Sequence, residues 1–192
     1  YVDAAKEVFL GSESDLSIQF FEAGNATDGA EARVKTGTNI WRTDGSTSAM
    51  RAADLVLEAG TGAIGTAASN VLVDLVGGGV LTARAAFGVH ITETLGDMRI
   101  GSVYSGSDGI YLTTVSGSII DGLDHEFTKL MANVIILDAH GGGIGELNDY
   151  LETDVVVDQP SEDVGAENFG TLTASADQSI ERRWAIDKRQ RL

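Results

Sequence analysis

The chain repeats part of its own sequence at an offset of about 80 residues. The segment DLVLEAGTGAIGTAASNVLVD, residues 54–74, aligns with VIILDAHGGGIGELNDYLETD, residues 134–154, so that Leu57 matches Leu137. Sandwiches and barrels have no reason to repeat side-chain identities at a fixed offset, whereas a solenoid does, because each coil packs only on its neighbours. The repeat therefore predicts a stack of coils in which leucines of both copies line one thin interior.

Short apolar runs recur along the chain, separated by Gly, Ser, Asp or Asn. Eight of these runs are expected to be strands: 55–57, 71–75, 80–82, 89–92, 98–100, 110–113, 118–120 and 134–137. With about 20 residues per coil, the chain would make about nine or ten coils. Alternation along strands predicts that Leu55 and Leu57 point inward and that His90 and Tyr111 are exposed outside. The glycines of 60–65 and 141–145 fit corners with positive φ or close backbone contacts.

Composition excludes several classes of protein. The absence of Cys excludes disulfides and thiolate metal sites, and we expect no membrane span because no apolar run is long enough. Nucleic acid is not expected as a partner, because the net charge is −16 and phosphate binding needs Lys and Arg. Since the chain begins with Tyr1 rather than Met, we expect a processed product or a piece of a longer protein.

Three regions are expected. Residues 1–28 lack a clear pattern and would form an irregular or capping segment, in which 2–9 fits a short helix or a strand and 16–21 a strand. Residues 29–157 carry the solenoid repeats. Residues 158–192 would form a polar loop, a final strand or coil and a basic tail.

An ordered series of motifs runs through the repeats: LVLEAGTGAIGTAASNVLVDL, GGGVLTARAAFGVHITE, GDMRIGSVYSGSDGIYLTTVSGSIIDG and NVIILDAHGGGIG. This series, within residues 33–180, resembles the repeat region of filamentous-haemagglutinin-like giant bacterial adhesins and related large secreted surface proteins. The resemblance implies an all-β, right-handed parallel β-helix (β-solenoid), an extracellular location, a structural or adhesive role and no catalytic residues. The acidic segment 149–167 and the ending RRWAIDKRQRL depart from the family pattern, which leaves room for a terminal or filament-forming module.

Charge is unevenly distributed near the C-terminus. An acidic group is followed by a basic group, and their members are Asp158, Glu162, Asp163 and Glu167, then Arg182, Arg183, Lys188, Arg189 and Arg191. These groups would pair within the chain or head to tail with a neighbouring copy, which would join rods into a filament. A solvated acidic face with a charged tail is the simpler alternative.

Two sets of side chains are candidates for ligand contacts. Calcium prefers oxygen ligands, and the dense acidic residues that offer them are Asp149, Glu152, Asp154 and Asp158; a solvated acidic face is again the alternative. Outward aromatic side chains either stack on sugars or cap coil edges, and the candidates are Trp41, Tyr104, Tyr111 and Tyr150. We expect His90, His125 and His140 to be unrelated surface residues rather than zinc ligands.

Enzymatic sites are weaker interpretations of this sequence. Residues 60–65, GTGAIG, fit a dinucleotide-binding pattern, but a strand rather than the required helix is expected to follow. Carboxylates near strand ends would suit a polysaccharide-cleaving solenoid, and the candidates are Asp121, Asp124, Asp138 and Glu152. We therefore expect a structural or adhesive extracellular rod without a cofactor, and a carbohydrate-binding or carbohydrate-cleaving solenoid is the alternative.

Overall fold

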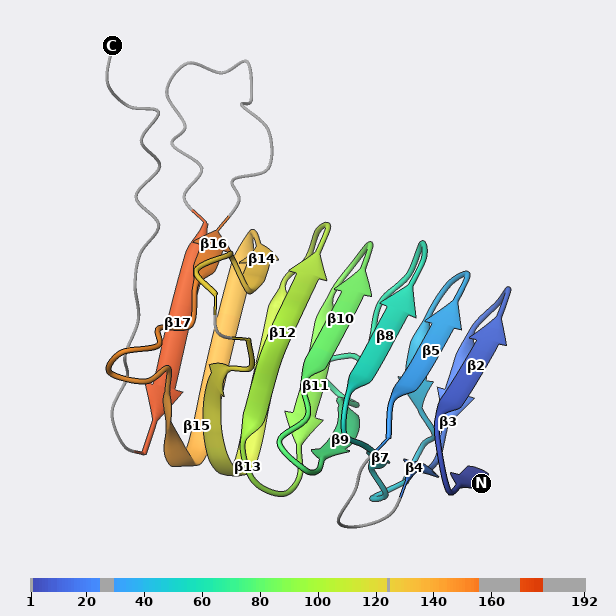
Figure 1. Ribbon diagram of the computed structural model, residues 1–192. Helices are drawn as coiled ribbons and strands as arrows, with labels where there is room; N and C mark the ends of the chain where they lie inside the picture. The colour runs from blue at the N-terminus through green and yellow to red at the C-terminus, as the bar shows by residue number, and fades with distance from the viewer. Residues whose placement is uncertain (1, 25–29, 124, 156–169, 178–192) are drawn as a thin grey trace, which may run out of the picture.

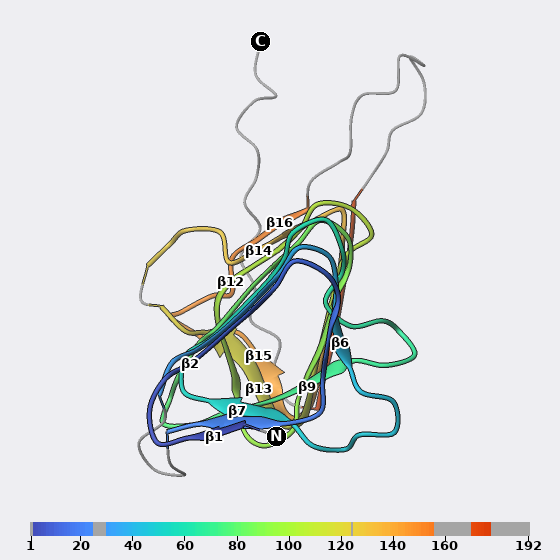
Figure 2. The same ribbon diagram turned by 90° about the vertical axis from the view of Figure 1, so that its right-hand side faces the viewer.

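The computed structural model describes residues 2–24, 30–123, 125–155 and 170–177. These residues form strands, turns and loops without any helix, and the strand ladders are parallel. The described residues wind into a β-solenoid of about six turns with a triangular cross-section (Figure 2). Seen from the N-terminal end, it turns clockwise as it recedes, so the coil is right-handed (Figures 1 and 2). The expected fold class is confirmed.

Three faces form the sides of the solenoid. Face 1 contains β2 (Val8–Ser12), β5 (Ala32–Thr36), β8 (Leu55–Ala59), β10 (Leu81–Ala85), the end of β12 (Met98–Ser105), β14 (Leu130–Ala132) and β16 (Thr153–Val155). Face 2 contains β3 (Leu16–Ile18), β6 (Ile40–Arg42), β11 (Val89–Glu93), the starts of β13 (Ile110–Asp121) and β15 (Val134–Ile144), and β17 (Thr171–Ala176). Face 3 contains β1 (Val2–Ala4), β4 (Phe21–Ala23), β7 (Met50–Ala52), the end of β9 (Val71–Leu75), the start of β12 and the ends of β13 and β15.

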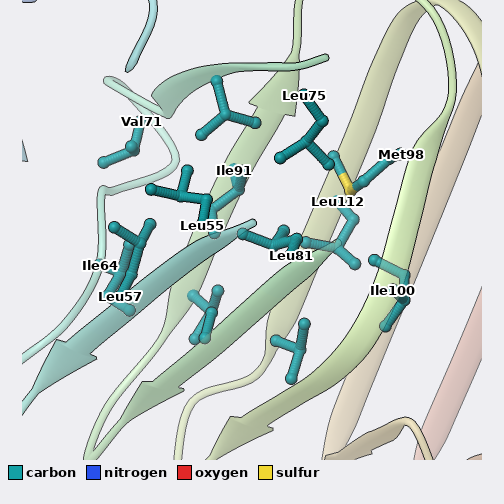
Figure 3. Packing of buried hydrophobic residues seen from close by; sticks show 14 of the residues in the cluster. Leu55, Leu57, Ile64, Val71, Leu75, Leu81, Ile91, Met98, Ile100 and Leu112 are labelled. Carbon is teal, nitrogen blue, oxygen red and sulfur yellow. The ribbon is translucent and has the colours of Figure 1, made fainter. Parts of the chain in front are cut away.

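Equivalent side chains of successive coils stack into ladders inside the solenoid. On face 1, Leu57 pairs in register with Val34 and Ala83, and all three are buried. On face 2, Leu137 pairs with Leu112 and is buried in the same hydrophobic cluster as Leu57. Figure 3 shows part of this cluster, including Leu57 and Leu112. The prediction of one shared aliphatic interior is confirmed, and burial of its apolar surface is the main stabilising contribution.

The two sequence copies nevertheless lie on different faces. Leu57 belongs to face 1 and Leu137 to face 2, one third of a turn further round. The unit that recurs is local: a strand, a glycine corner, one buried Ile and a turn closed by an antiparallel bridge. The bridge joins Thr66 to Ser69 in the first copy and Glu146 to Asp149 in the second.

Coil length explains this displacement. Leu55 follows its partner Ala32 by 23 residues (55 − 32), and Leu81 follows Leu55 by 26 (81 − 55). About three and one third coils of about 24 residues account for the offset of about 80. At about 24 residues per turn, 192 residues suffice for about eight turns, so the expectation of nine or ten coils was too high.

All eight expected strands are present, and the runs 110–113 and 118–120 are joined in the single long strand β13. The N-terminal region, expected to be irregular, contains four strands, and β2 pairs in register with β5 of the next coil. Leu55 and Leu57 point inward as predicted. His90 is not exposed as expected: it is 8% exposed, because the ring of Tyr111 from the next coil stacks on it at 4.2 Å.

Side-chain oxygens join the corners of successive coils. Asp15 Oδ1 accepts the Asn39 N–H at 3.1 Å, and Asn39 Oδ1 accepts the Ala63 N–H one coil further at 2.8 Å. Hydrogen bonds from the side chain of Thr38, and then from those of Asn39 and Trp41, lower the pKa of Asp15 to about 2. The corner leaves no room for a side chain beyond glycine, since a Cβ at Gly62 would lie 2.5 Å from the Thr38 carbonyl oxygen.

Candidate functional site

A shallow groove runs along the solenoid axis at the corner between faces 1 and 2, beyond the arrowheads of β5, β8, β10 and β12 in Figure 1. Its lining includes small residues of successive coils, Gly60, Ala86 and Gly106. The groove has a volume of about 490 Å³, and a neighbouring depression of about 520 Å³ extends it toward Gly11. The two share Lys35 and Gly60, so they form one continuous surface along the axis.

One row of outward side chains borders this groove. Lys35, Glu58, Arg84 and Tyr104 occupy matching positions of four successive strands. The Lys35 ammonium lies 3.0 Å from the Glu58 carboxylate, and the Arg84 guanidinium lies 4.6 Å from the centre of the Tyr104 ring. Coils are spaced by about 4.8 Å, so the row offers polar and aromatic contacts at regular steps along the axis. Such an arrangement suits an extended polymer lying in the groove.

Of the predicted sugar-stacking residues, the structure brings only Tyr104 to this groove. Trp41 lies on face 2, where its indole N–H donates to Asp15 Oδ2 at 3.2 Å. Tyr111 is stacked on His90, and Tyr150 lies half-buried beyond the turn that follows β15. Sequence reasoning missed Arg84 and Lys35, although both occupy the fourth position of aligned strands, in LTARA and ARVKT.

The predicted calcium ligands are dispersed in the part of the chain that the structure describes. Asp149 closes the bridged turn after β15, Glu152 faces Lys129, and Asp154 is exposed on β16. Asp158 lies outside the described residues. Within the described ranges, no group of three or more His, Asp or Glu side chains is arranged to hold a metal ion. Calcium binding stays a prediction.

The predicted charge pairing between neighbouring copies falls entirely outside the described residues. This applies to the acidic group, Asp158, Glu162, Asp163 and Glu167, and to the basic group, Arg182, Arg183, Lys188, Arg189 and Arg191. Head-to-tail pairing through these residues therefore stays a prediction.

A buried ionic cluster lies at the corner between faces 3 and 1. The side chains of Lys129 and Asp121 are both 0% exposed and in direct contact, and Glu152 Oε2 lies 3.8 Å from Lys129 Nζ. Lys129 Nζ also donates to Leu123 O at 3.1 Å and to His125 O at 2.6 Å. Burial raises the pKa of the Glu152 carboxyl, an effect that the nearby Lys129 opposes.

This cluster changes the interpretation of the carboxylates proposed for sugar cleavage. Asp121 and Glu152 do come together, but around a buried lysine rather than across an open cleft. Asp138 lies 3.1 Å from His140, with which it forms a surface pair on face 2, and Asp124 lies outside the described residues. His125 also belongs to the cluster, since its Nδ1 is 3.3 Å from Lys129 Nζ.

A second buried acid lies where β11 ends. Glu93 is fully buried, and its carboxyl oxygens accept N–H groups of Leu75 and Leu95, each at 3.1 Å. Removal from water raises the pKa of Glu93 to about 8, although these N–H donors favour the charged form. The raised pKa therefore favours the protonated form of Glu93 at neutral pH.

No helix within the described residues is long and apolar enough to cross a membrane. Comparison with known proteins adds no relative: no protein-family model, no curated protein and no solved structure matches this chain.

Proposed function

We propose that this chain is a rod-forming structural and adhesive segment of a bacterial extracellular surface protein. The observation that carries the proposal is the stack of parallel coils on one continuous aliphatic interior. In such an architecture each coil depends only on its neighbours, so a rod lengthens by addition of coils. The motif series that resembles giant adhesins supports the same role.

The ends of the described solenoid support end-to-end assembly. Among the described strands, β2 pairs only with β5 at one end, and β17 pairs only with β15 at the other. Strand edges of this kind are templates for pairing with another chain or with a further coil. The rod would thus continue either into neighbouring repeats of a parent chain or into a second copy.

Electron microscopy across salt concentrations tests assembly. One unit of about six turns is about 29 Å long at the inter-strand spacing. We expect particles whose lengths are multiples of this unit, with a distribution that changes with ionic strength. Particles that stay at the length of one unit at every ionic strength would contradict filament formation.

The axial groove favours a second function on the same rod, the binding of a linear glycan. Tyr104 would contact a sugar ring with the part of its ring that the Arg84 guanidinium does not cover, and Arg84 would donate hydrogen bonds to hydroxyl or carboxylate oxygens beside it. The regular spacing of the row matches a repeating ligand better than a compact one.

A glycan array of neutral and acidic linear polysaccharides tests this binding. Tyr104→Ala should weaken binding about tenfold, the upper range for loss of one stacking contact. Arg33→Ala is the matched control, because Arg33 is exposed on face 1 but does not line the groove. Equal binding by wild type and Tyr104→Ala would refute the groove as the site. Shortening of the bound polysaccharide in the same samples would instead support the carbohydrate-cleaving alternative.

A further inference from the structure

Lys129 is held against Asp121 in a geometry suited to covalent chemistry. Both side chains are completely buried, and they are in direct contact. Two N–H groups of Nζ donate to the carbonyl oxygens of Leu123 and His125. His125 Nδ1 lies 3.3 Å from Nζ as a further polar neighbour. When the amine is neutral, hydrogen bonds to the two carbonyl oxygens would leave its lone pair free to face the Asp121 carboxyl group, with which Nζ is in contact.

Amide formation also needs a hydrogen-bond donor to the attacked carboxyl group and a group that moves protons, and both lie beside this pair. Asp121 Oδ1 accepts the Leu123 backbone N–H at 2.7 Å, so a donor already faces the oxygen that would become negative during attack on the carboxyl carbon. Glu152 Oε2 is buried without a hydrogen-bond partner, 3.8 Å from Lys129 Nζ. An acid held away from water in this position is suited to move protons between the reacting groups.

We propose that Lys129 and Asp121 condense into an intramolecular amide that cross-links their side chains, with Glu152 as the proton relay. This modification is independent of the proposed adhesive role. It would close the corner between β13 and β14 with a covalent bond.

The step balances without any cofactor. A proton passes from the Lys129 ammonium to Asp121 Oδ2, which leaves a neutral amine and a neutral acid. Nζ then attacks Cγ, and the C=O electron pair moves to Oδ1. Glu152 gives its proton to the Oδ2 hydroxyl, which departs as water when the carbonyl re-forms, and Glu152 regains a proton from the nitrogen. One N–C bond forms, one C–O bond breaks, and nothing is oxidised or reduced.

Burial favours the product. An ammonium and a carboxylate in the interior have both lost their hydration, and the amide replaces two desolvated charges with one neutral polar group. The surface pair of Lys35 and Glu58 provides the contrast. Its atoms are 3.0 Å apart, but its side chains are 76% and 41% exposed, so it should remain an ion pair.

Mass spectrometry of the denatured protein tests the proposal. We expect an intact mass below the sequence mass by one water, about 18 Da. Trypsin should fail to cleave after Lys129, because its amine is blocked. The sequence has no other Lys or Arg between Arg99 and Arg182, so a single peptide of residues 100–182 should replace the two peptides 100–129 and 130–182. Cleavage after Lys35 serves as the internal control.

Two variants separate this reaction from other causes of water loss. Asp121 precedes Gly122, and cyclisation of the backbone at this pair would also remove one water. The cyclised product would leave the chain cleavable by trypsin after Lys129. It would also still form in Lys129→Arg, whereas the cross-link would be absent from that variant. Glu152→Gln should fold, as judged by circular dichroism, and should condense about 100-fold more slowly. A wild-type protein with the full sequence mass and normal cleavage after Lys129 would overturn the proposal, and unchanged condensation in Glu152→Gln would remove Glu152 from it.

Discussion

The buried acid Glu93 should make the stability of this solenoid depend strongly on pH. The carboxyl lies in the interior at the end of β11, where ionisation would place a negative charge away from water. Its pKa is raised from an ordinary value of 4.5 to about 8, mainly by burial. In the unfolded chain the same group is exposed to water and ionises at its ordinary pKa.

The sign and size of the effect follow from these two values. Below pH 4.5 the carboxyl is neutral in both states, so its contribution to stability is fully present. Between pH 4.5 and about 8 it ionises only in the unfolded state, and the free energy of unfolding falls by about 1.4 kcal/mol per pH unit. Over this window the loss reaches about 5 kcal/mol at most. Above pH 8 the contribution becomes constant.

Urea unfolding of wild type and Glu93→Gln from pH 4 to pH 9 measures this contribution. The neutral amide of Gln does not ionise. The free energy of unfolding of the variant minus that of wild type should therefore increase as pH rises, and this difference should become constant near pH 8. Glu13→Gln, which removes an exposed carboxylate, controls for the change in net charge. Parallel pH profiles for wild type and Glu93→Gln would refute the assignment of a protonated buried acid.

Three further predictions concern the interior and the corners. Leu57→Ala should lower the free energy of unfolding by about 2–5 kcal/mol in urea titrations, because it opens a cavity in a ladder, whereas Val56→Ala on the outward side of the same strand should cost less than about 1 kcal/mol. Gly62→Ala should lower the thermal midpoint, since its Cβ would lie 2.5 Å from a carbonyl oxygen of the preceding coil, whereas Gly11→Ala, with its nearest neighbour at 4.0 Å, should leave it unchanged. The pKa of Asp15 is about 2 against an ordinary 3.8, so the contribution of this carboxylate to stability is present above pH 3.8 and is lost as pH falls through 2. Acid unfolding of Asp15→Ala, followed by circular dichroism, should therefore be less steep over this range than that of wild type.

The fold class could be predicted from the sequence because inward and outward residues alternate along each strand. Leu55 and Leu57 are inward whichever face their strand occupies. The face itself could not be predicted, since it depends on the number of residues per turn, and the bridged turns at 66–69 and 146–149 add residues without adding a strand. His90 was misjudged for a related reason: its cover, Tyr111, comes from another coil and depends on the register between strands.

The candidate sites were only partly predictable. Tyr104 was recognised as an outward aromatic residue, but its neighbour Arg84 becomes relevant only once strands β10 and β12 are aligned. Asp121 and Glu152 were selected for a different chemistry, because the lysine between them was overlooked. Lys129 did carry a signal, since it is an isolated cation in a long stretch of sequence without other Lys or Arg. Its burial, however, depends on the path of the corner loop and not on local sequence pattern.

The second sequence copy lies one third of a turn further round the solenoid than the first, and this displacement has a geometric consequence. A duplication of about three and one third turns rotates every surface feature by about 120° around the rod. If such units were added in series, the bridged turns would follow a screw path, and each side of the rod would present one of them every three units. A fibre decorated in this way shows the same projections in all directions around its circumference, so it needs no preferred orientation toward the surface that it meets.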